Sequence, residues 1–454
     1  MLEEALAYAR QNRERFLSEL MEVLTIPSIS TDPDHAPDMQ RAAEWMSAQL
    51  VSMGMNNVQV LETGGHPVVY GEWLGAGAAA PTVMVYGHYD VQPPDPLELW
   101  STPPFEPAVR GDDLFARGSA DMKGQVVASF KAVESMVRTG RLPVNIKWLI
   151  EGEEEIGSEN LDSFIKGHQE LLACDFCLNT DAGILAPDEP SITTGLRGLA
   201  YFELRVHGPT KDLHSGLFGG IVHNPAQVLA DLIAGMHGAG GKVTLPGFYD
   251  KVRKLSAKER KELARLPLSR KLFLKQTGAP ALWGEPNFTP AERLGTRPTL
   301  EVNGLLSGFT GPGSKTVLPA WAMAKISCRL VPDQTVAQTN RQMRAYLTKH
   351  APKDVRWELK YLHGADAALV SSSSPWIQAM SDAMRDVWGK KPHFLREGGS
   401  IGVVAQLQKR LGVDSVLSGF ALPDCDAHSP DEKLHLPTWY KGIEALIRFF
   451  HHLK

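Results

Sequence analysis

Cysteine is scarce in this sequence, because four residues in a chain of 454 are too few for a disulfide framework. Long hydrophobic runs are missing as well: no stretch approaches the roughly 20 apolar residues that span a bilayer. Positive charge is not in surplus, since 47 lysines and arginines face 52 acidic residues for a formal net charge of −5. A general nucleic-acid binder would need a basic surplus. We therefore expect a cytoplasmic protein with neither a membrane nor a nucleic-acid partner.

The first 24 residues place apolar side chains at helical spacing and include Glu3 and Glu4, which predicts an amphipathic helix and not a signal peptide. The whole chain exceeds the length at which one hydrophobic core stops growing, so two domains are expected. Near its start, apolar runs alternate with helical patterns, which favours an α/β fold with a mixed, mainly parallel sheet flanked by helices. The predicted strands are residues 82–88, 144–150 and 175–181, with a helix over residues 124–137.

The middle of the chain has a different pattern. Residues 200–208 and 321–332 alternate between apolar and polar, which is typical of antiparallel strands with one buried face. Asn224 followed by Pro225 marks the start of one helix, and a second is expected from about 333 to 350. The predicted domains are a larger one of residues 1–198 and 368–454 and a smaller inserted α/β domain, an antiparallel sheet with two helices, of residues 199–367.

Side chains able to bind a metal follow the ends of the predicted strands. His88 and Asp90 come at the end of the first strand. The consecutive glutamates Glu153–Glu155 follow the second, and Asp181 ends the third. Asp121 precedes the helix between the first two strands. Because ligands of open α/β sheets bind beyond the carboxyl ends of the strands, these side chains are expected to gather at one edge.

Each of these residues also has a purely structural explanation. His88 could be an ordinary histidine after a strand, Asp121 a helix N-cap and Asp181 a turn residue. Their combination favours another explanation, because three carboxylates and a histidine brought together without a cation would repel one another strongly. The strand ends therefore predict a metal site.

Seven motifs occur along the chain in a fixed order: GHYDVQP, RGSADMKG, EGEEEIGS, TD after a strand, DLHSG, REGGS and DAHSPDEKL. In this order they resemble the aminoacylase/carnosinase family of dinuclear-zinc metallopeptidases, and the GHYDVQP form is most similar to its dipeptidase, or carnosinase-like, branch. The resemblance covers residues from about 80 to 450. It implies that the larger domain is catalytic and that the inserted domain serves as a lid and in dimerisation.

The resemblance implies two divalent metal ions. One would be held by His88 and Asp181. The second would be held by Glu155 and His428, and Asp121 would bridge the two. Two protein ligands per ion plus a shared carboxylate leave an open position for water, as a catalytic site requires. The ions are expected to be Zn²⁺, although such ligands also accept Mn²⁺ or Co²⁺.

The resemblance also implies a separate role for several of the glutamates in IEGEEEIGSE, residues 150–159. Glu154 would be the general base, because a glutamate beside the metals can take a proton from an acidified water and deliver it to the departing amine. Glu155 would be the ligand. Glu151 is expected to support the site from behind, and Glu153 to point away from the metals.

Two more residues would act beside the metals. Asp90, two positions after His88, would accept the second ring N–H of that histidine. His214 resembles the family histidine that reaches the substrate carbonyl from the partner subunit of a homodimer, where it would stabilise the developing oxyanion. The alternatives are a turn aspartate at position 90 and a plain surface histidine at position 214.

The substrate contacts are also implied by resemblance. Arg329 and Thr316 resemble positions that hold the C-terminal carboxylate of the substrate, and arginine suits this because its fork pairs bidentately. A simple surface ion pair is the alternative for Arg329. Gly399 and Ser400, in REGGS, would let the backbone approach the ligand closely.

The function most consistent with these residues is that of a metallopeptidase, a hydrolase that cleaves dipeptides or short peptides with a free C-terminal carboxylate by a metal-activated water. Alternatives are an N-acyl amino acid deacylase with the same metal core and a non-catalytic, metal-dependent binding protein. The pair Glu154–Glu155 speaks against the last, since binding alone needs no adjacent base. Ala182 and Gly183 replace a bulky aromatic stretch of many carnosinase-like enzymes, so a carnosine preference is not implied.

Overall fold

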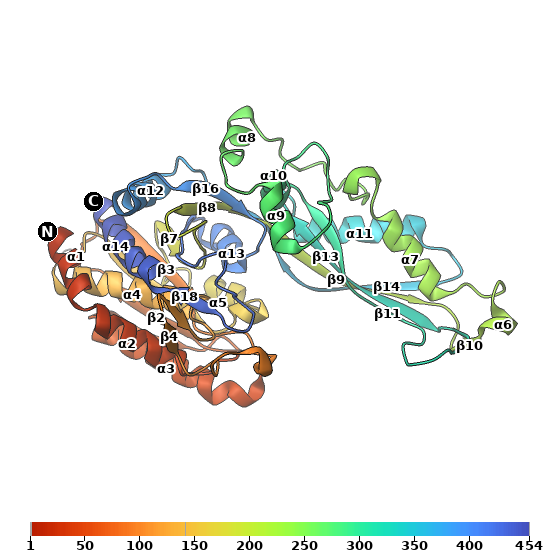
Figure 1. Cartoon of the computed structure of the whole chain (residues 1–454), viewed down its shortest axis with the longest axis horizontal. Helices are drawn as coiled ribbons and strands as arrows, with labels where there is room; N and C mark the ends of the chain where they lie inside the picture. The colour runs from red at the N-terminus through yellow and green to blue at the C-terminus, as the bar shows by residue number, and fades with distance from the viewer. Residues whose placement is uncertain (1, 141, 454) are drawn as a thin grey trace. The chain divides into compact units, whose positions relative to one another are not determined.

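The computed structural model describes residues 2–140 and 142–453. These residues form two compact units, and Figure 1 labels most of their elements. The first unit comprises the residues up to Thr194, Val370–Leu395 and the residues from Val403 onward. The second comprises Gly195–Leu369 and Arg396–Gly402. The short last segment carries the REGGS motif, so this motif belongs to the second unit.

The core of the first unit is a mixed sheet with strands in the order β1-β2-β6-β3-β7-β17-β8. The central strands β6, β3, β7 and β17 are parallel, whereas β1, β2 and β8 pair in antiparallel fashion. Strand β3 is almost wholly buried, which explains why TVMVYGH is nearly continuously apolar. The strands are β1 Asn56–Leu61, β2 Val68–Trp73, β3 Thr82–His88, β6 Asn145–Glu151, β7 Phe176–Asn179, β8 Ser191–Leu196 and β17 Ser415–Leu417.

Helix α4 links the sheet to the surrounding helices. It is buried from Lys123 to Met136, and it contacts β3 on one side and α1, α2 and α14 elsewhere. The helix predicted over residues 124–137 is confirmed, whereas the single N-terminal helix is in fact two, α1 and α2. The helices of this unit are α1 Leu2–Gln11, α2 Arg13–Leu24, α3 Ala36–Ser52, α4 Lys123–Arg138, α5 Leu161–Gly167, α12 Pro375–Trp388, α13 Gly402–Leu411 and α14 Leu436–His452.

The second unit is built on an antiparallel sheet in the order β11-β13-β9-β14. Burial alternates along β13, as the sequence pattern predicted. Helices α7 and α11 pack on the sheet (Figure 1), and their buried side chains share one cluster with those of β9 and β13. Asn224 caps α7, since its side-chain oxygen accepts a hydrogen bond from the Ala226 N–H. The bounds are β9 Gly198–His207, β11 Thr299–Ser307, β13 Trp321–Leu330, β14 Arg356–Ala365, α7 Pro225–Gly235 and α11 Val336–His350. The predicted fold class, an α/β domain with a smaller antiparallel domain, is therefore confirmed.

Shorter elements complete the two units. In the first unit β18, β5 and β4 form a small antiparallel sheet, and in the second β10 pairs with β12. None of the helices in the described residues is long and apolar enough to cross a membrane. The remaining bounds are β4 Ala108–Arg110, β5 Asp113–Phe115, β10 Leu213–His214, β12 Val317–Leu318, β15 Ala368–Leu369, β16 His393–Glu397, β18 Lys433–His435, α6 Ser215–Phe218, α8 Ala257–Leu263, α9 Arg270–Thr277 and α10 Pro290–Thr296.

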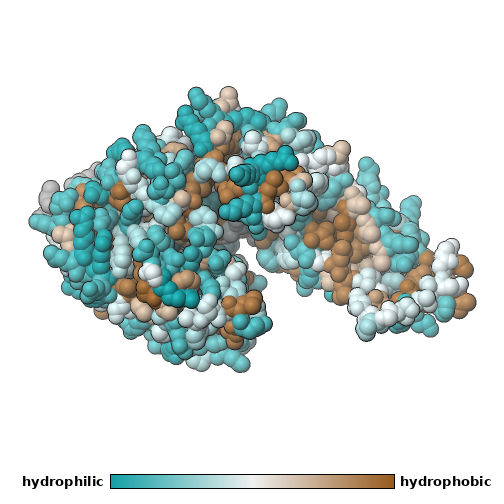
Figure 2. Space-filling view, viewed as in Figure 1, coloured by the Kyte–Doolittle hydropathy of each residue, from teal (hydrophilic) through white to brown (hydrophobic). Residues whose placement is uncertain are grey.

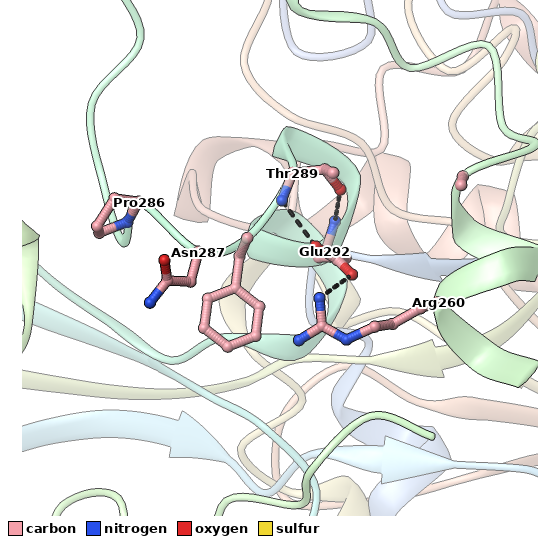
Figure 3. A pocket seen from close by; sticks show the side chains of 7 residues that line it. Arg260, Pro286, Asn287, Thr289 and Glu292 are labelled. Atoms are coloured by element: carbon pink, nitrogen blue, oxygen red, sulfur yellow. Dashed lines mark hydrogen bonds and ion pairs between the residues drawn. The ribbon is translucent and has the colours of Figure 1, made fainter. Parts of the chain in front are cut away.

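A cavity of ≈ 430 Å³ lies in the second unit beside α8 and α10 (Figure 3). Its charged groups already have partners: an Arg260 Nη1 N–H donates to Glu292 Oε1 at 2.9 Å, and the guanidinium carbon of Arg260 lies 5.2 Å from the centroid of the Phe288 ring. Glu292 also closes the N-cap of α10 with Thr289. The polar groups of this cavity therefore stabilise the local helices.

Candidate active site

Three parallel strands of the first unit deliver the candidate ligands to one edge of the sheet. His88 is the last residue of β3 and pairs in register with Glu151, the last residue of β6. Asp181 lies two residues beyond β7, which also pairs with β3. The predicted third strand ends earlier than expected, at Asn179, because the Asn179 side chain accepts a hydrogen bond from the Asp181 N–H and turns the chain. The strand ends therefore converge as the pattern predicted.

Asp121 lies between two histidines. Its Oδ1 is 3.2 Å from Nε2 of His88, and its Oδ2 is 3.0 Å from Nε2 of His428. Nε2 of His428 is also 3.2 Å from Oε2 of Glu155. Two groups of side chains able to hold a metal ion result, one of His88, Asp121 and Asp181 and one of Asp121, Glu155 and His428, each with its ligand atoms within 4.8 Å of one another. Asp121 belongs to both groups.

The charges at this edge of the sheet fit divalent cations. Burial would raise the pKa of Asp121, but hydrogen bonds with His428 and His88 outweigh it and lower that pKa below its ordinary value. Hydrogen bonds with Asp121 and Glu155 raise the pKa of His428 to about 10. Carboxylate oxygens with one imidazole nitrogen per group form a donor set that zinc, manganese or cobalt ions accept. The residues present therefore suit a pair of such ions.

Asp90 holds both His88 and the Glu155 segment in place. The His88 Nδ1 lies 3.0 Å from the Asp90 backbone oxygen and 3.3 Å from its Oδ1. A proton on Nδ1 leaves Nε2, the atom that faces Asp121, as a lone-pair donor. Oδ2 of Asp90 accepts hydrogen bonds from Ser30 Oγ at 2.7 Å and from the Glu155 N–H at 3.0 Å. Asp90 is thus more than a turn residue, since it orients one ligand and the backbone of another.

Gln92 is a residue of the site that sequence reasoning missed. Its Nε2 donates to Oε2 of Glu155 at 2.8 Å and more weakly to the Glu155 backbone oxygen at 3.3 Å. The only available signal was its place in GHYDVQP, four residues after His88. Because an amide N–H that holds a carboxylate restricts its rotation, Gln92 orients the candidate ligand Glu155.

Glu154 is partly buried and directly precedes the candidate ligand Glu155. Burial is the main cause that raises its pKa well above the ordinary value, and the carboxylates of Asp181 and Glu155 add to it, while His88 opposes them. Such a raised pKa is typical of a carboxyl that transfers protons. Behind it, the Tyr86 hydroxyl donates to Oε1 of the buried Glu151 at 2.7 Å, and burial raises the pKa of Glu151 to about 8.

Glu153 has a different set of partners from its neighbours. Its Oε1 accepts hydrogen bonds from the His66 N–H at 2.9 Å and from the Asn160 side chain at 3.0 Å. Its Oε2 accepts from the Asn160 N–H at 3.2 Å. The side chain therefore ties two loops together and does not belong to either group of candidate ligands.

The second unit brings Arg329 and Ser400 together. An Arg329 Nη1 N–H donates to Ser400 Oγ at 2.8 Å, and the Ser400 hydroxyl donates to the backbone oxygen of Arg197 at 2.5 Å. Burial lowers the pKa of Arg329. Among the described residues no carboxylate pairs with Arg329. This arginine therefore does not form the surface ion pair that was the alternative to substrate binding. A Cβ at Gly399 would meet only open space, which leaves its backbone accessible.

His214 and Thr316 lie next to each other in the same unit. β10 pairs with β12 so that His214 faces Val317, and the Thr316 backbone oxygen accepts a hydrogen bond from the Ser215 N–H at 3.0 Å. Nδ1 of His214 accepts from the Gly216 N–H at 3.0 Å, so its other ring nitrogen is the one that can donate. Both residues are exposed.

Comparisons with known proteins show the family of this chain. The profile of Peptidase family M20/M25/M40 matches residues 84–452. The chain is 31% identical over 460 residues to the Cys-Gly metallodipeptidase DUG1 of Candida albicans, covering 97% of this chain and 95% of that one. It is 29% identical over 473 residues to the Beta-Ala-His dipeptidase of Homo sapiens, covering 99% and 92%. The solved structure of the metallo-carboxypeptidase Sso-CP2 from Sulfolobus solfataricus superposes with a TM-score of 0.86 at 32% identity, covering 96% and 99%.

Proposed function

The chain belongs to the peptidase family M20/M25/M40, and we propose that it carries out its reaction with two divalent ions held on either side of Asp121. It is a metal-dependent peptidase that hydrolyses the amide bond of dipeptides, in keeping with the metallodipeptidases it is similar to. The single observation that carries the two-ion proposal is that one carboxylate, Asp121, belongs to both groups of candidate ligands. A deacylase is not favoured by any of these relatives.

His88 and Asp181 would complete the first ion site, and Glu155 and His428 the second. When bound, the ions would acidify a water and polarise the substrate carbonyl. We infer zinc as the native metal, with manganese or cobalt as accepted substitutes, because the donors are carboxylates with one histidine per ion. Asp90 would keep His88 in the tautomer that a metal ligand needs.

Glu154 would be the general base. Burial is the main cause of its raised pKa, and the charges of the candidate ligands Asp181 and Glu155, which lie near it, add to the effect. It would take a proton from the attacking water and pass it to the departing amine, so one side chain would serve both steps. Glu151 and Glu153 have other partners and Glu155 is a candidate ligand, which leaves Glu154 as the proton carrier among the glutamates at positions 151 and 153–155.

We propose that the second unit recognises the substrate. The guanidinium of Arg329, bonded to Ser400 but paired with no carboxylate among the described residues, would hold the free C-terminal carboxylate. The open backbone at Gly399 would lie against the same group. The relative from Candida albicans is named for Cys-Gly, which makes this dipeptide the first substrate to test.

A homodimer through the second unit is also proposed. His214, the last residue of β10, and Thr316, directly before β12, are both exposed, as is expected of residues that act on a neighbouring subunit. Hydrophobic surface accompanies them at this end of the second unit (Figure 2). The exposed apolar residues include Leu217, Phe218 and Ile221 near α6 and Leu305 and Leu306 on the sheet-edge strand β11. Exposed apolar surface is typical of protein–protein contacts.

A cytoplasmic location fits the same proposal. All four cysteines, Cys174, Cys177, Cys328 and Cys425, are free thiols. Burial raises the pKa of Cys174 to about 12 and of Cys425 to about 11, so neither is poised as a thiolate at neutral pH. Free thiols persist in reducing compartments.

The activity is tested with a substrate screen on metal-loaded protein. Dipeptides with a free carboxylate, the same dipeptides as C-terminal amides, and N-acetyl amino acids are compared by quantifying the released amine. We expect cleavage of the free dipeptides, with the amides strongly disfavoured. Chelation should abolish the activity, and added Zn²⁺ should restore it. Full activity in demetallated protein, or hydrolysis of N-acetyl amino acids alone, would contradict the proposal.

The role of His214 across subunits has its own test. His214→Ala and Glu154→Ala are each expected to be inactive. Co-expressed, they form mixed dimers in which one site combines an intact Glu154 with a His214 from the other chain. Random pairing should then restore roughly a quarter of wild-type activity. No recovery in a verified mixed dimer would show that His214 does not act on the neighbouring subunit.

A further inference from the structure

Glu432 is buried directly before β18, in the segment that carries His428. Its carboxylate accepts four hydrogen bonds, all from the loop that leads to Asp121. Oε1 accepts from the Ala120 N–H at 2.9 Å and from the Asp121 N–H at 3.0 Å. Oε2 accepts from the Gly118 N–H and from Arg117 Nη1, both at 2.8 Å. One side chain thus accepts from three backbone N–H groups and from one guanidinium group of this loop.

These contacts act on the backbone that sets the position of Asp121. The Asp121 N–H is bonded to Glu432, while its two side-chain oxygens face His88 and His428. A buried backbone N–H without an acceptor is costly, so the loop needs Glu432 in order to keep this conformation. Glu432 therefore fixes the position of the Asp121 side chain through the Asp121 backbone, and not through either histidine.

The same residue anchors the segment that carries His428. The His428 side chain is 53% exposed, so its position relative to Asp121 and Glu155 depends largely on its backbone. The segment is fixed just after His428, where Asp431 accepts hydrogen bonds from the Ser101 N–H and hydroxyl. Glu432 follows, and its backbone oxygen accepts from the Ala116 N–H at 3.1 Å.

We propose that Glu432 is a positioning residue that joins the Asp121 loop to the His428 segment and so sets the separation between the bridging carboxylate and the histidine of the second ion. This inference rests on the metal-ligand roles proposed above for Asp121 and His428. Residues that orient ligands in this way control metal affinity, and their loss typically weakens binding 10- to 100-fold.

Arg117 completes the arrangement. Its side chain is only 1% exposed, and its pair with Glu432 is buried on both sides. Its Nη2 also donates to the Pro93 backbone oxygen at 3.3 Å, and its guanidinium carbon lies 5.4 Å from the Trp100 ring centroid. The cation is therefore fixed independently, so that it holds the Glu432 carboxylate in the orientation that the loop requires.

The test compares Glu432→Gln with a matched control, Glu134→Gln. Glu134 is also a buried carboxylate of the first unit, paired with Arg15 at 2.5 Å and Lys131 at 3.1 Å, but it bonds to no candidate ligand. Both variants lose a buried ion pair and should lose comparable thermal stability. Only the change at Glu432 should alter the metal site, because an amide cannot accept at both ends from four donors.

The readouts are the stoichiometry and affinity of Zn²⁺ binding to metal-free protein by calorimetry, and the visible spectrum of bound Co²⁺, which reports ligand geometry. For Glu432→Gln we expect the second ion to bind with 10- to 100-fold lower affinity, and we expect an altered Co²⁺ spectrum. Glu134→Gln should bind both ions as the wild type does. Glu432→Asp, which keeps the charge on a shorter stem, should recover part of the affinity.

Wild-type affinity in Glu432→Gln, or an equal loss in Glu134→Gln, would overturn the positioning role. If Glu432→Gln does not fold, Arg117→Lys replaces it. The shorter lysine side chain cannot reach both Glu432 and the Pro93 backbone oxygen, so it should also lower the affinity for the second ion. Unchanged binding in a folded Arg117→Lys protein would then count against the proposal. A wild-type protein that binds fewer than two ions would instead contradict the proposed two-ion function, so the two failures are distinguishable.

Discussion

Nε2 of His428 lies 3.0 Å from Oδ2 of Asp121, although 307 positions separate the two residues in the chain. The other oxygen of the same carboxylate faces His88. Asp121 is therefore the residue through which the two groups of candidate ligands are connected, and its removal should affect both.

Asp121→Ala is expected to reduce the metal content from two ions per chain to none. Asp181→Ala is the matched comparison, because Asp181 belongs to one group only and its loss should leave one ion. Metal content is measured by inductively coupled plasma mass spectrometry after dialysis against metal-free buffer. Equal metal content in the two variants would show that Asp121 is not shared.

Glu154→Gln should lower kcat about 10²- to 10⁴-fold, since an amide cannot carry the proton. Metal content should stay at the wild-type level. Glu153→Gln is the control: it changes the neighbouring charge but loses only bonds to His66 and Asn160, so it should reduce stability and spare kcat. Substantial turnover by Glu154→Gln would remove this residue from the mechanism.

The raised pKa of Glu151 predicts that the stability of the protein depends on pH. Burial, reinforced by the charge of Asp90, raises its pKa from the ordinary 4.5 to about 8, against the hydrogen bond from Tyr86. The folded protein thus holds this proton more tightly than the unfolded chain does. Its contribution to stability is complete below about pH 4.5 and is lost as the pH rises through about 8.

Glu151→Gln stays neutral and keeps an acceptor for the Tyr86 hydroxyl. Without metal, the variant should therefore become more stable relative to the wild type as the pH rises from about 5 to about 8. The quantity compared is the free energy of unfolding of the variant minus that of the wild type. Urea titrations at a series of pH values measure this difference. A difference that does not change with pH would contradict the raised pKa of Glu151.

Gln92→Leu should lower the binding affinity for one of the two ions selectively. The change removes the N–H that holds Oε2 of Glu155, a member of only one group of candidate ligands. We expect roughly a tenfold loss of affinity for the ion of the Glu155 group. The other ion is the internal control in the same calorimetric titration, and an equal loss at both sites would argue against a specific role for Gln92.

Much of the site was predictable from the chain because its main residues follow strand ends. His88, Glu155 and Asp181 lie beside strands whose apolar runs are visible in the sequence, and the motifs identified the family. Gln92 and Glu432 were not predictable. Their partners lie 63 and 311 positions away, and a glutamine or glutamate in a polar loop has no local pattern that indicates a distant contact.

The sequence by itself determined the main strands β3, β6, β7, β9 and β13, the helices α4, α7 and α11, the fold class and the chemistry of the candidate ligands. These follow from local periodicity and side-chain type, because burial of apolar residues acts on each segment through its own spacing. Only the tertiary structure decided that Gln92 holds Glu155, that Glu153 binds His66 and Asn160, and that Glu432 supports the Asp121 loop. Hydrogen bonds between distant segments depend on packing to within fractions of an ångström, and no local pattern contains that information.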